Sequence, residues 1–128
     1  MTEQRNNPKL LIVDDEVKLC ELLALYFQAK GFSVMAATTV AQATKLLDST
    51  PFDAAILDVN LDGESGFDVL DYIKRKSPAM PVFMFTGLDV DEQLVKKTLR
   101  GRAEGIIHKT QSLERISEAV RSRLARPM

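Results

Sequence analysis

The sequence predicts an α/β protein built on a doubly wound, five-stranded parallel sheet, the flavodoxin-like (βα)5 arrangement. Short apolar runs alternate with longer segments in which apolar residues recur at helical spacing. The runs are apolar at successive positions, which is typical of strands that helices cover on both faces. This alternation repeats five times within 128 residues, a length that suits one domain.

The first two strand–helix units are marked by clear boundary residues. A branched apolar run at 9–13 predicts a strand, and helical spacing follows over 16–30, where Gly31 is the expected C-terminal cap. The second unit combines a strand at 32–37 with a helix at 39–48. Thr38 or Thr39 is the expected N-cap of that helix, because a hydroxyl can accept a hydrogen bond from its first turn.

The last three units repeat the same order of strand and helix. Asp89 is a possible N-cap for the fourth helix. We expect strands at 54–58, 81–86 and 106–108, and helices at 65–76, 90–100 and 112–124.

Composition excludes several classes of protein. The apolar runs are too short to span a membrane, and the polar residues 1–8 lack the core of a signal peptide, so we expect a cytoplasmic protein. The expected organisation is a polar tail at 1–8, a domain at 9–125 and a tail at 126–128. Cys20 is the only cysteine, which excludes a disulfide within the chain, and its apolar neighbours place it near the core.

Charge is distributed unevenly along the chain. The net charge of −1 gives no general case for nucleic-acid binding. Residues 1–64 hold 5 basic and 10 acidic residues, whereas residues 65–128 hold 12 and 8. The acidic half suggests a cation site, and the basic half is either a docking face or a solvated helix surface.

Polar residues follow four of the five predicted strands. In sheets of this kind, ligands bind outside the carboxyl ends of the strands, at the switch point of strand order. Asp14 and Asp15 follow the first strand, Asp58 ends the third, Thr86 ends the fourth and Lys109 follows the fifth. We therefore expect three carboxylates, a hydroxyl and an ammonium group to meet at one edge of the sheet.

These groups together favour phosphoryl chemistry. Two carboxylates about 4 Å apart repel by about 4 kcal/mol at an effective dielectric of about 20, so either one is protonated or a cation lies among them. Mg²⁺ fits an oxygen-rich site of this kind, and a carboxylate beside it can act as a nucleophile towards phosphorus. Alone, each residue has an ordinary explanation, such as a helix N-cap for Asp14 or Asp15. Their joint placement points to function.

The sequence resembles the receiver domains of two-component response regulators. The resemblance runs from about residue 9 to residue 124, in order and with suitable gaps. It rests on Leu11-Ile12-Val13-Asp14-Asp15-Glu16, Ile56-Leu57-Asp58-Val59-Asn60-Leu61, Gly66, Phe83-Met84-Phe85-Thr86-Gly87 and Ala103-Glu104-Gly105-Ile106-Ile107-His108-Lys109.

The resemblance implies a phosphorylation-dependent signalling switch rather than an enzyme with an external substrate. Asp58 would be the phosphoacceptor, and the donor would be a histidine kinase or a histidine phosphotransfer protein. Thr86 and Lys109 would bind phosphoryl oxygens. Mg²⁺ would be held directly by Asp15 and Asp58, through water by Asp14, and by the backbone carbonyl of Asn60.

The resemblance also implies what the switch acts on. The expected target is a downstream protein or an effector domain outside this chain, without direct contact to nucleic acid or membrane, and the expected state is a monomer or weak homodimer. No effector domain follows the fifth unit in this sequence. The chain is therefore either a single-domain regulator, which we favour, or the receiver part of a longer protein.

Three positions depart from the usual receiver pattern. Asp62, followed by Gly63, stands where a proline is usual, and Thr110 stands where a proline usually follows the lysine. Without proline the cis form costs about 2.5–4 kcal/mol, so we predict a trans bond between Lys109 and Thr110.

Ile106 replaces the usual aromatic residue, so we expect phosphorylation to be transmitted by a shift of residues 87–100.

Three alternatives are weaker. Residues 58–63 match the first half of an EF-hand loop, but the bidentate glutamate that the loop needs would fall at Val69. A haloacid-dehalogenase-like phosphatase needs an acid two residues after its nucleophile, where this chain has Asn60. A binding module that keeps the fold without phosphorylation does not need the full acidic set. A single histidine, His108, argues against a zinc site.

Overall fold

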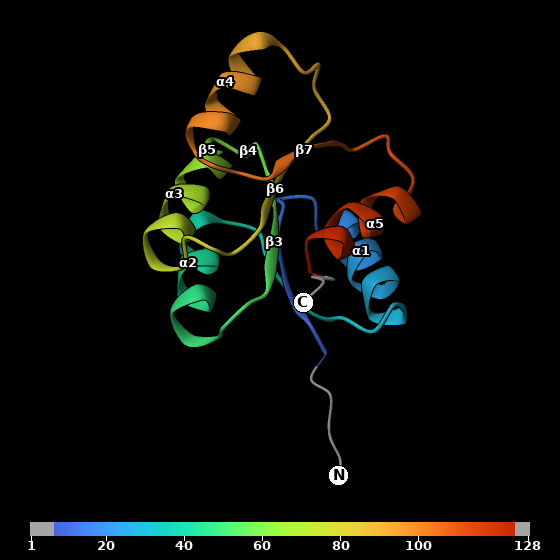
Figure 1. Ribbon diagram of the computed structural model, residues 1–128. Coiled ribbons are helices and arrows are strands. Elements are labelled where there is room, and N and C mark those ends of the chain that lie inside the picture. The colour runs from blue at the N-terminus through green and yellow to red at the C-terminus, as the bar shows by residue number, and fades with distance from the viewer. Residues whose placement is uncertain (1–6, 125–128) are drawn as a thin grey trace.

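The strands of the computed structural model form one five-stranded parallel sheet, which confirms the predicted fold class (Figure 1). The structure describes residues 7–124, so most of the predicted N-terminal tail and all of the tail at 126–128 lie outside the described residues. The strand order is β2-β1-β3-β6-β7. The strands are β1 (Lys9–Val13), β2 (Ser33–Ala37), β3 (Ala54–Asp58), β6 (Val82–Thr86) and β7 (Gly105–His108).

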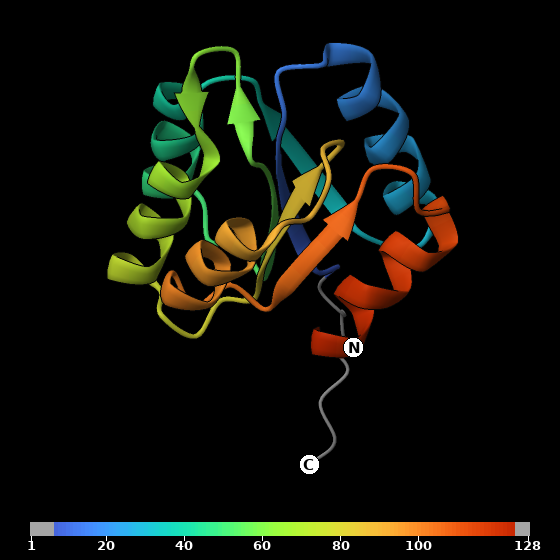
Figure 2. The ribbon, with the colours of Figure 1, turned by 90° about the horizontal axis from the view of Figure 1, so that it is seen from above.

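Helices cover both sides of this sheet. α2, α3 and α4 lie on one side, and α1 and α5 lie on the other (Figures 1 and 2). Within the described residues, no helix is both long and apolar enough to cross a membrane. The helices are α1 (Val17–Ala29), α2 (Val40–Ser49), α3 (Gly66–Lys76), α4 (Glu92–Arg100) and α5 (Leu113–Leu124).

Two apolar cores result from this layering. On one side Leu11, Leu57 and Met84 of the sheet pack with α2 and α3, and on the other side Ile12 and Phe85 pack with α1 and α5. Every residue of β3 and β6 is buried, as expected for central strands of a parallel sheet. Cys20 is buried in the second core, as predicted.

The edge strand β2 does not follow the prediction that strands are covered on both faces. Met35 is 42% exposed, and Ala36 is exposed beside it. Because β2 pairs with β1 alone and lies at the end of the sheet, the flanking helices do not cover it completely. An apolar run therefore predicts a strand here without predicting its burial.

Two predicted helix ends are confirmed. Thr39, and not Thr38, is the N-cap of α2, because its side chain accepts a hydrogen bond from the Gln42 N–H at 3.1 Å. Gly31 follows the C-cap of α1 with a φ of 96°, the left-handed conformation in which glycine has no Cβ penalty. The N–H groups of Gly31 and Phe32 then satisfy the last carbonyls of the helix, those of Gln28 and Phe27.

The predicted cap of α4 is wrong. The helix begins at Glu92, and its N-cap is Asp91, whose Oδ1 accepts a hydrogen bond from the Leu94 N–H at 2.8 Å. Asp89 lies in the preceding loop. An N-cap residue has an extended backbone and lies three residues before the N–H group that donates to its side chain. Asp91 has φ −101° and ψ 175° and lies three residues before Leu94, so it meets both conditions.

Removing this cap should destabilise the protein measurably. For Asp91→Ala we expect the free energy of unfolding to fall by about 1 kcal/mol, because one N–H of the first turn loses its acceptor. Asp89→Ala is the matched control and should stay within about 0.5 kcal/mol of wild type. Urea unfolding of both variants measures the difference, and an equal loss in both would contradict this assignment of the cap.

A small hairpin that the sequence analysis did not predict follows β3. Its strands are β4 (Asn60–Leu61) and β5 (Glu64–Ser65), and Asp62 and Gly63 form its turn with φ values of 47° and 91°. Two positive φ values suit the primed two-residue turns of hairpins, for which Asp-Gly is a strong signal. The Glu64 side chain accepts a hydrogen bond from the Val40 N–H at 2.9 Å, so the hairpin is fastened to the start of α2.

Candidate functional site

The carboxyl ends of four sheet strands bring the predicted polar residues to one edge of the sheet. Strand order reverses between β1 and β3, which are neighbours although β2 lies between them in sequence. Asp14 follows β1 and Asp58 ends β3, so both lie at this switch point. Thr86 ends β6, and Lys109 follows β7. This is the position at which open α/β sheets bind their ligands.

Three carboxylates form the centre of the site. One oxygen of each of Asp14, Asp15 and Asp58 lies within 4.8 Å of the others. Asp14 is completely buried, Asp58 is 5% exposed and Asp15 is half-buried. The Asp14 Oδ1 accepts a hydrogen bond from the Glu16 N–H at 2.9 Å, which fixes the turn between β1 and α1.

Lys109 supplies the positive charge beside these carboxylates. Its Nζ lies 3.0 Å from Asp14 Oδ2, 3.2 Å from Asp58 Oδ2 and 3.1 Å from Glu16 Oε1. Burial lowers the pKa of Lys109, but its three carboxylate neighbours outweigh burial and raise that pKa above its ordinary value. Lys109 therefore stays charged. Glu16 was not predicted as a site residue, although it directly follows the two aspartates.

The Asp58 carboxyl group is held in an unfavourable environment for its charge. Burial, followed by repulsion from Asp14, raises the pKa of Asp58 to about 6, although Lys109 opposes the shift. The Asp58 Oδ1 also accepts a long hydrogen bond of 3.3 Å from the Asn60 N–H. Added positive charge near Asp58 would therefore stabilise its ionised form.

Thr86 lies at the site but is bonded away from the carboxylates. Its buried hydroxyl accepts a hydrogen bond from the Leu88 N–H at 3.0 Å. The Thr86 carbonyl accepts a hydrogen bond from the Lys109 N–H at 2.7 Å, so the ends of β6 and β7 are tied together. The bond between Lys109 and Thr110 is trans, as predicted, and no cis bond occurs among the residues described.

The residues present suit a hard divalent cation. Carboxylate and carbonyl oxygens are the ligands that Mg²⁺ prefers. Among residues 7–124, the Asp14 Oδ2 is the one buried side-chain oxygen or nitrogen without a hydrogen-bond partner, despite its closeness to Lys109. This oxygen has Lys109 as its charge partner but no hydrogen bond of good geometry, so it can take a further contact from a cation, or from a water that a cation holds.

Comparison with known proteins shows the family. Residues 10–121 match the model of the response regulator receiver domain. The chain belongs to this family. Receiver domains are phosphorylation-dependent switches of two-component signalling and act with histidine kinases and effector domains. The match leaves the phosphatase and EF-hand alternatives without support.

Relatives of this receiver domain include longer proteins. It is 32% identical over 118 residues to the regulatory protein VanR of Enterococcus faecium, covering 92% of this chain and 50% of VanR. It is 35% identical over 119 residues to a cyclic di-GMP phosphodiesterase of Thermotoga maritima, covering 90% of this chain and 32% of that protein. The chain thus spans half or less of the length of these relatives.

Solved structures agree with the fold. The receiver domain of NtrX from Brucella abortus is 28% identical, with a TM-score of 0.83 over 92% of this chain and 99% of that one. A CheY-like receiver domain protein from Methanospirillum hungatei has a TM-score of 0.88 at 22% identity, over 93% and 94% of the two chains. The latter likeness concerns the fold alone.

Proposed function

We propose that this receiver domain takes a phosphoryl group on Asp58, with Mg²⁺ bound beside it. The observation that carries the proposal is the position of Asp58 at the end of a central strand, among two further carboxylates and 3.2 Å from the Lys109 ammonium group. Within the cluster, only Asp14 and Asp58 lie at the switch point and form an ion pair with Lys109. Asp14 is completely buried, so it is the poorer nucleophile for an incoming donor.

The proposed reaction transfers the phosphoryl group between two side chains. An oxygen of Asp58 forms a bond to phosphorus while the bond from phosphorus to the histidine nitrogen of the donor breaks, and the electron pair stays on that nitrogen. Lys109 stays charged and can move from the carboxylates to a phosphoryl oxygen, where a charge-assisted hydrogen bond is strong. The Thr86 hydroxyl can donate to a second oxygen once it turns from Leu88.

The resemblance assigns the metal to four residues. Asp15 and Asp58 would hold Mg²⁺ directly, the Asn60 carbonyl would be a further ligand, and Asp14 would act through water. Bound there, Mg²⁺ would supply positive charge that offsets the three carboxylates and the charge of the transferred group. The Asp14 Oδ2 supports this assignment, because a held water would give it a hydrogen bond in addition to its ion pair with Lys109.

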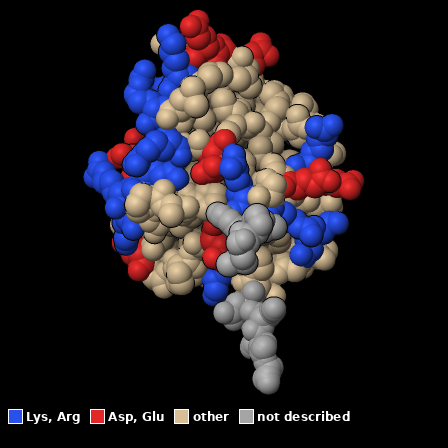
Figure 3. All heavy atoms as spheres, viewed as in Figure 1, with Lys and Arg blue, Asp and Glu red and all other residues tan. Residues whose placement is uncertain are grey.

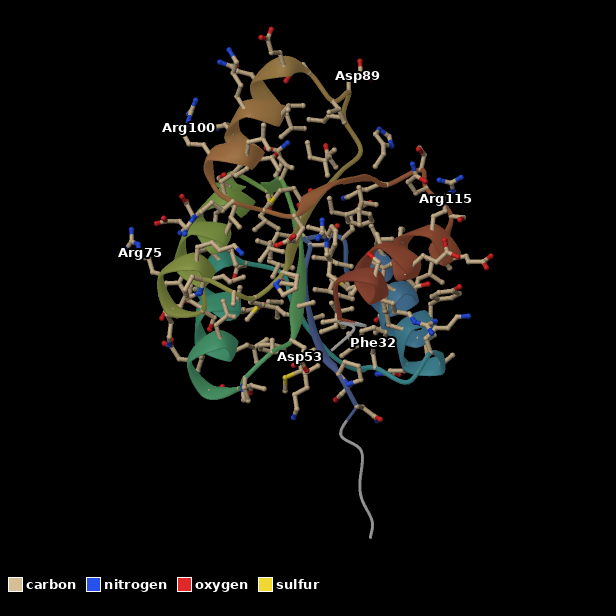
Figure 4. The ribbon with its side chains drawn as sticks, viewed as in Figure 1. Phe32, Asp53, Arg75, Asp89, Arg100 and Arg115 are labelled. Carbon is tan, nitrogen blue, oxygen red and sulfur yellow. The ribbon has the colours of Figure 1, made fainter. Side chains whose placement is uncertain are left out.

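Labelling with a small phosphoryl donor tests the proposal. With acetyl phosphate and Mg²⁺, the intact mass of the wild-type chain should rise by one phosphoryl unit. Asp58→Asn should not be labelled, because an amide oxygen is a poor nucleophile, and chelation of Mg²⁺ should suppress labelling of wild type. Asp53→Asn, which lies at the opposite end of β3, is the control (Figure 4). Normal labelling of Asp58→Asn would reject Asp58 as the phosphoacceptor.

Magnesium affinity should depend more on Asp15 than on Asp14. A directly bound carboxylate is closer to the ion and therefore contributes more Coulomb energy than one that acts through water. We expect Asp15→Asn to weaken binding at least tenfold and Asp14→Asn to weaken it less. Calorimetric titration with MgCl₂ measures both constants. Equal or reversed losses would contradict the assigned ligand roles.

We further propose that the domain is a regulator and not a hydrolase with its own external substrate. Its proposed donor is a histidine kinase or a phosphotransfer protein, and its proposed target is a protein or an effector domain. The phosphodiesterase name belongs to a relative of which this chain covers 32%. The predicted domain limits of 9–125, the cytoplasmic location and the monomeric or weakly dimeric state stay predictions.

A further inference from the structure

A groove between α3 and α4 combines an apolar floor with a basic rim. Its volume is about 270 Å³. The groove lies on the side of the molecule that carries most of the Lys and Arg atoms in Figure 3, and Arg75 and Arg100 project from α3 and α4 there (Figure 4). We define the α3–α4 groove by its floor residues Phe67 and Leu70 and its rim residues Lys74, Lys97, Arg100 and Arg102; one carboxylate, that of Asp71, also lines it.

The four rim cations differ from the other cations of the same helices. Within residues 7–124, none of the four has a carboxylate oxygen within 4.0 Å. The cations outside the groove are each paired: Arg75 with Asp71 at 2.6 Å, Lys76 with Asp48 at 2.7 Å, and Lys96 with Glu92 at 3.5 Å. The groove therefore holds four cations without a carboxylate partner among the described residues, and its one carboxylate, Asp71, is already paired with Arg75.

Lys74 adds a buried cation to this groove. It is 6% exposed, and its Nζ donates hydrogen bonds to the carbonyls of Met80 at 2.7 Å and Pro78 at 3.3 Å. Burial lowers the pKa of Lys74; the negative charge of Glu104 opposes this shift, and the positive charge of Arg102 adds to it. Lys74 therefore adds positive charge beneath the rim, while the other three rim cations are the ones left to pair with a ligand.

Arg102 occupies a backbone position that favours glycine. Its φ is 67°, and its N–H donates to the Leu99 carbonyl at 3.0 Å in the turn that closes α4. Gly31 holds the equivalent position after α1, whereas in α4 the glycine, Gly101, lies one residue earlier with a φ of −78°. A residue other than glycine carries a backbone cost in this conformation, which makes Arg102 a residue to test at the rim of the groove.

We propose that the α3–α4 groove binds an acidic segment of a partner protein. Carboxylates of the segment would pair with the rim cations, and one or two apolar side chains would lie on Phe67 and Leu70. A volume of about 270 Å³ is near the lower end of ligand pockets, which is enough room for one or two side chains of a peptide. Lys97 lies 5.2 Å from the centre of the Phe67 ring, so floor and rim are in contact.

A nucleic acid fits these observations less well. It needs a continuous basic stripe, but here the flanking cations are paired with carboxylates and the net charge of the chain is −1. The proposal does not depend on phosphorylation of Asp58, so the unphosphorylated protein can test it, and failure of either proposal leaves the other standing.

Fluorescence anisotropy with a labelled short peptide of alternating glutamate and leucine tests the proposal on the full chain at low and physiological salt. We expect binding by wild type, and a loss of affinity of at least tenfold in the double variant Arg100→Gln/Arg102→Gly. Glycine suits the backbone at 102, so this variant should fold, which circular dichroism checks. The control, Lys76→Gln/Lys96→Gln, removes the same charge from α3 and α4 outside the groove, leaves the Arg75–Asp71 pair intact, and should change affinity less than twofold.

Three outcomes would overturn the proposal. The first is no binding of the peptide by wild type. The second is an equal loss in the groove and control variants, which would mean that only net charge matters. The third is tighter binding of a labelled single-stranded oligonucleotide or of pyrophosphate than of the peptide, with the same dependence on Arg100 and Arg102. Amide shifts of α3 and α4 on addition of peptide would support it.

Discussion

Gly66→Ala is expected to lower the free energy of unfolding by about 3–5 kcal/mol and to prevent labelling of Asp58. A methyl carbon on Gly66 would lie 1.8 Å from the Asp58 carbonyl oxygen and 2.9 Å from its carbonyl carbon. Non-bonded contacts normally need about 3.5 Å, and both atoms belong to backbone that cannot rotate away. The start of α3 must therefore move from the end of β3, breaking the hydrogen bond from the Gly66 N–H to Val59.

Urea unfolding and phosphoryl labelling together measure this effect. Gly105→Ala is the matched control, because a methyl group there has no neighbour within 4 Å and the backbone is not left-handed. We expect the control to stay within about 1 kcal/mol of wild type and to be labelled normally. A Gly66→Ala variant with wild-type stability would show that the contact between Gly66 and Asp58 is not tight in solution.

Asp58→Asn is expected to stabilise the magnesium-free protein at pH 8, by on the order of 2 kcal/mol. The folded state raises the pKa of Asp58 to about 6, above the value of about 3.9 in an unfolded chain. The folded protein therefore binds this proton more tightly, and wild-type stability falls as the pH rises from about 4 through 6. The asparagine variant lacks this penalty, so its advantage should be full at pH 8 and should shrink towards pH 5.

Melting temperatures of wild type and Asp58→Asn at pH 5 and pH 8, with EDTA or with Mg²⁺, test whether the substitution stabilises the protein as predicted. Mg²⁺ should raise the melting temperature of wild type more than that of Asp58→Asn, because binding to the folded state adds stability. Asp48→Asn is an opposite control: a hydrogen bond from Lys76 lowers the pKa of Asp48, so its replacement should lower the melting temperature at pH 8. A lower melting temperature for Asp58→Asn in EDTA at pH 8 would contradict the prediction.

Local sequence patterns were sufficient for most of the fold. Apolar runs and helical spacing predicted all five strand–helix units, with ends that differ from the structure by at most two residues. Hydroxyl and glycine signals predicted the ends at Thr39 and Gly31. These features depend on residues a few positions apart. The choice of Asp91 over Asp89 was not predictable in this way, because both are aspartates before the same helix and only the loop geometry separates them.

By itself, the sequence determined the order of the units and which polar residues follow the strands. A fold rule then placed Asp14, Asp15, Asp58 and Lys109 at one edge, where the structure brings their side chains together. Tertiary structure alone decided the finer contacts: the third carboxylate beside Lys109, from Glu16, and the buried Asp14 oxygen that has an ion pair but no hydrogen bond. The positive charge of the α3–α4 groove likewise depends on which cations form ion pairs with carboxylates. These features depend on distances between side chains from separate elements, and packing, not local periodicity, sets such distances.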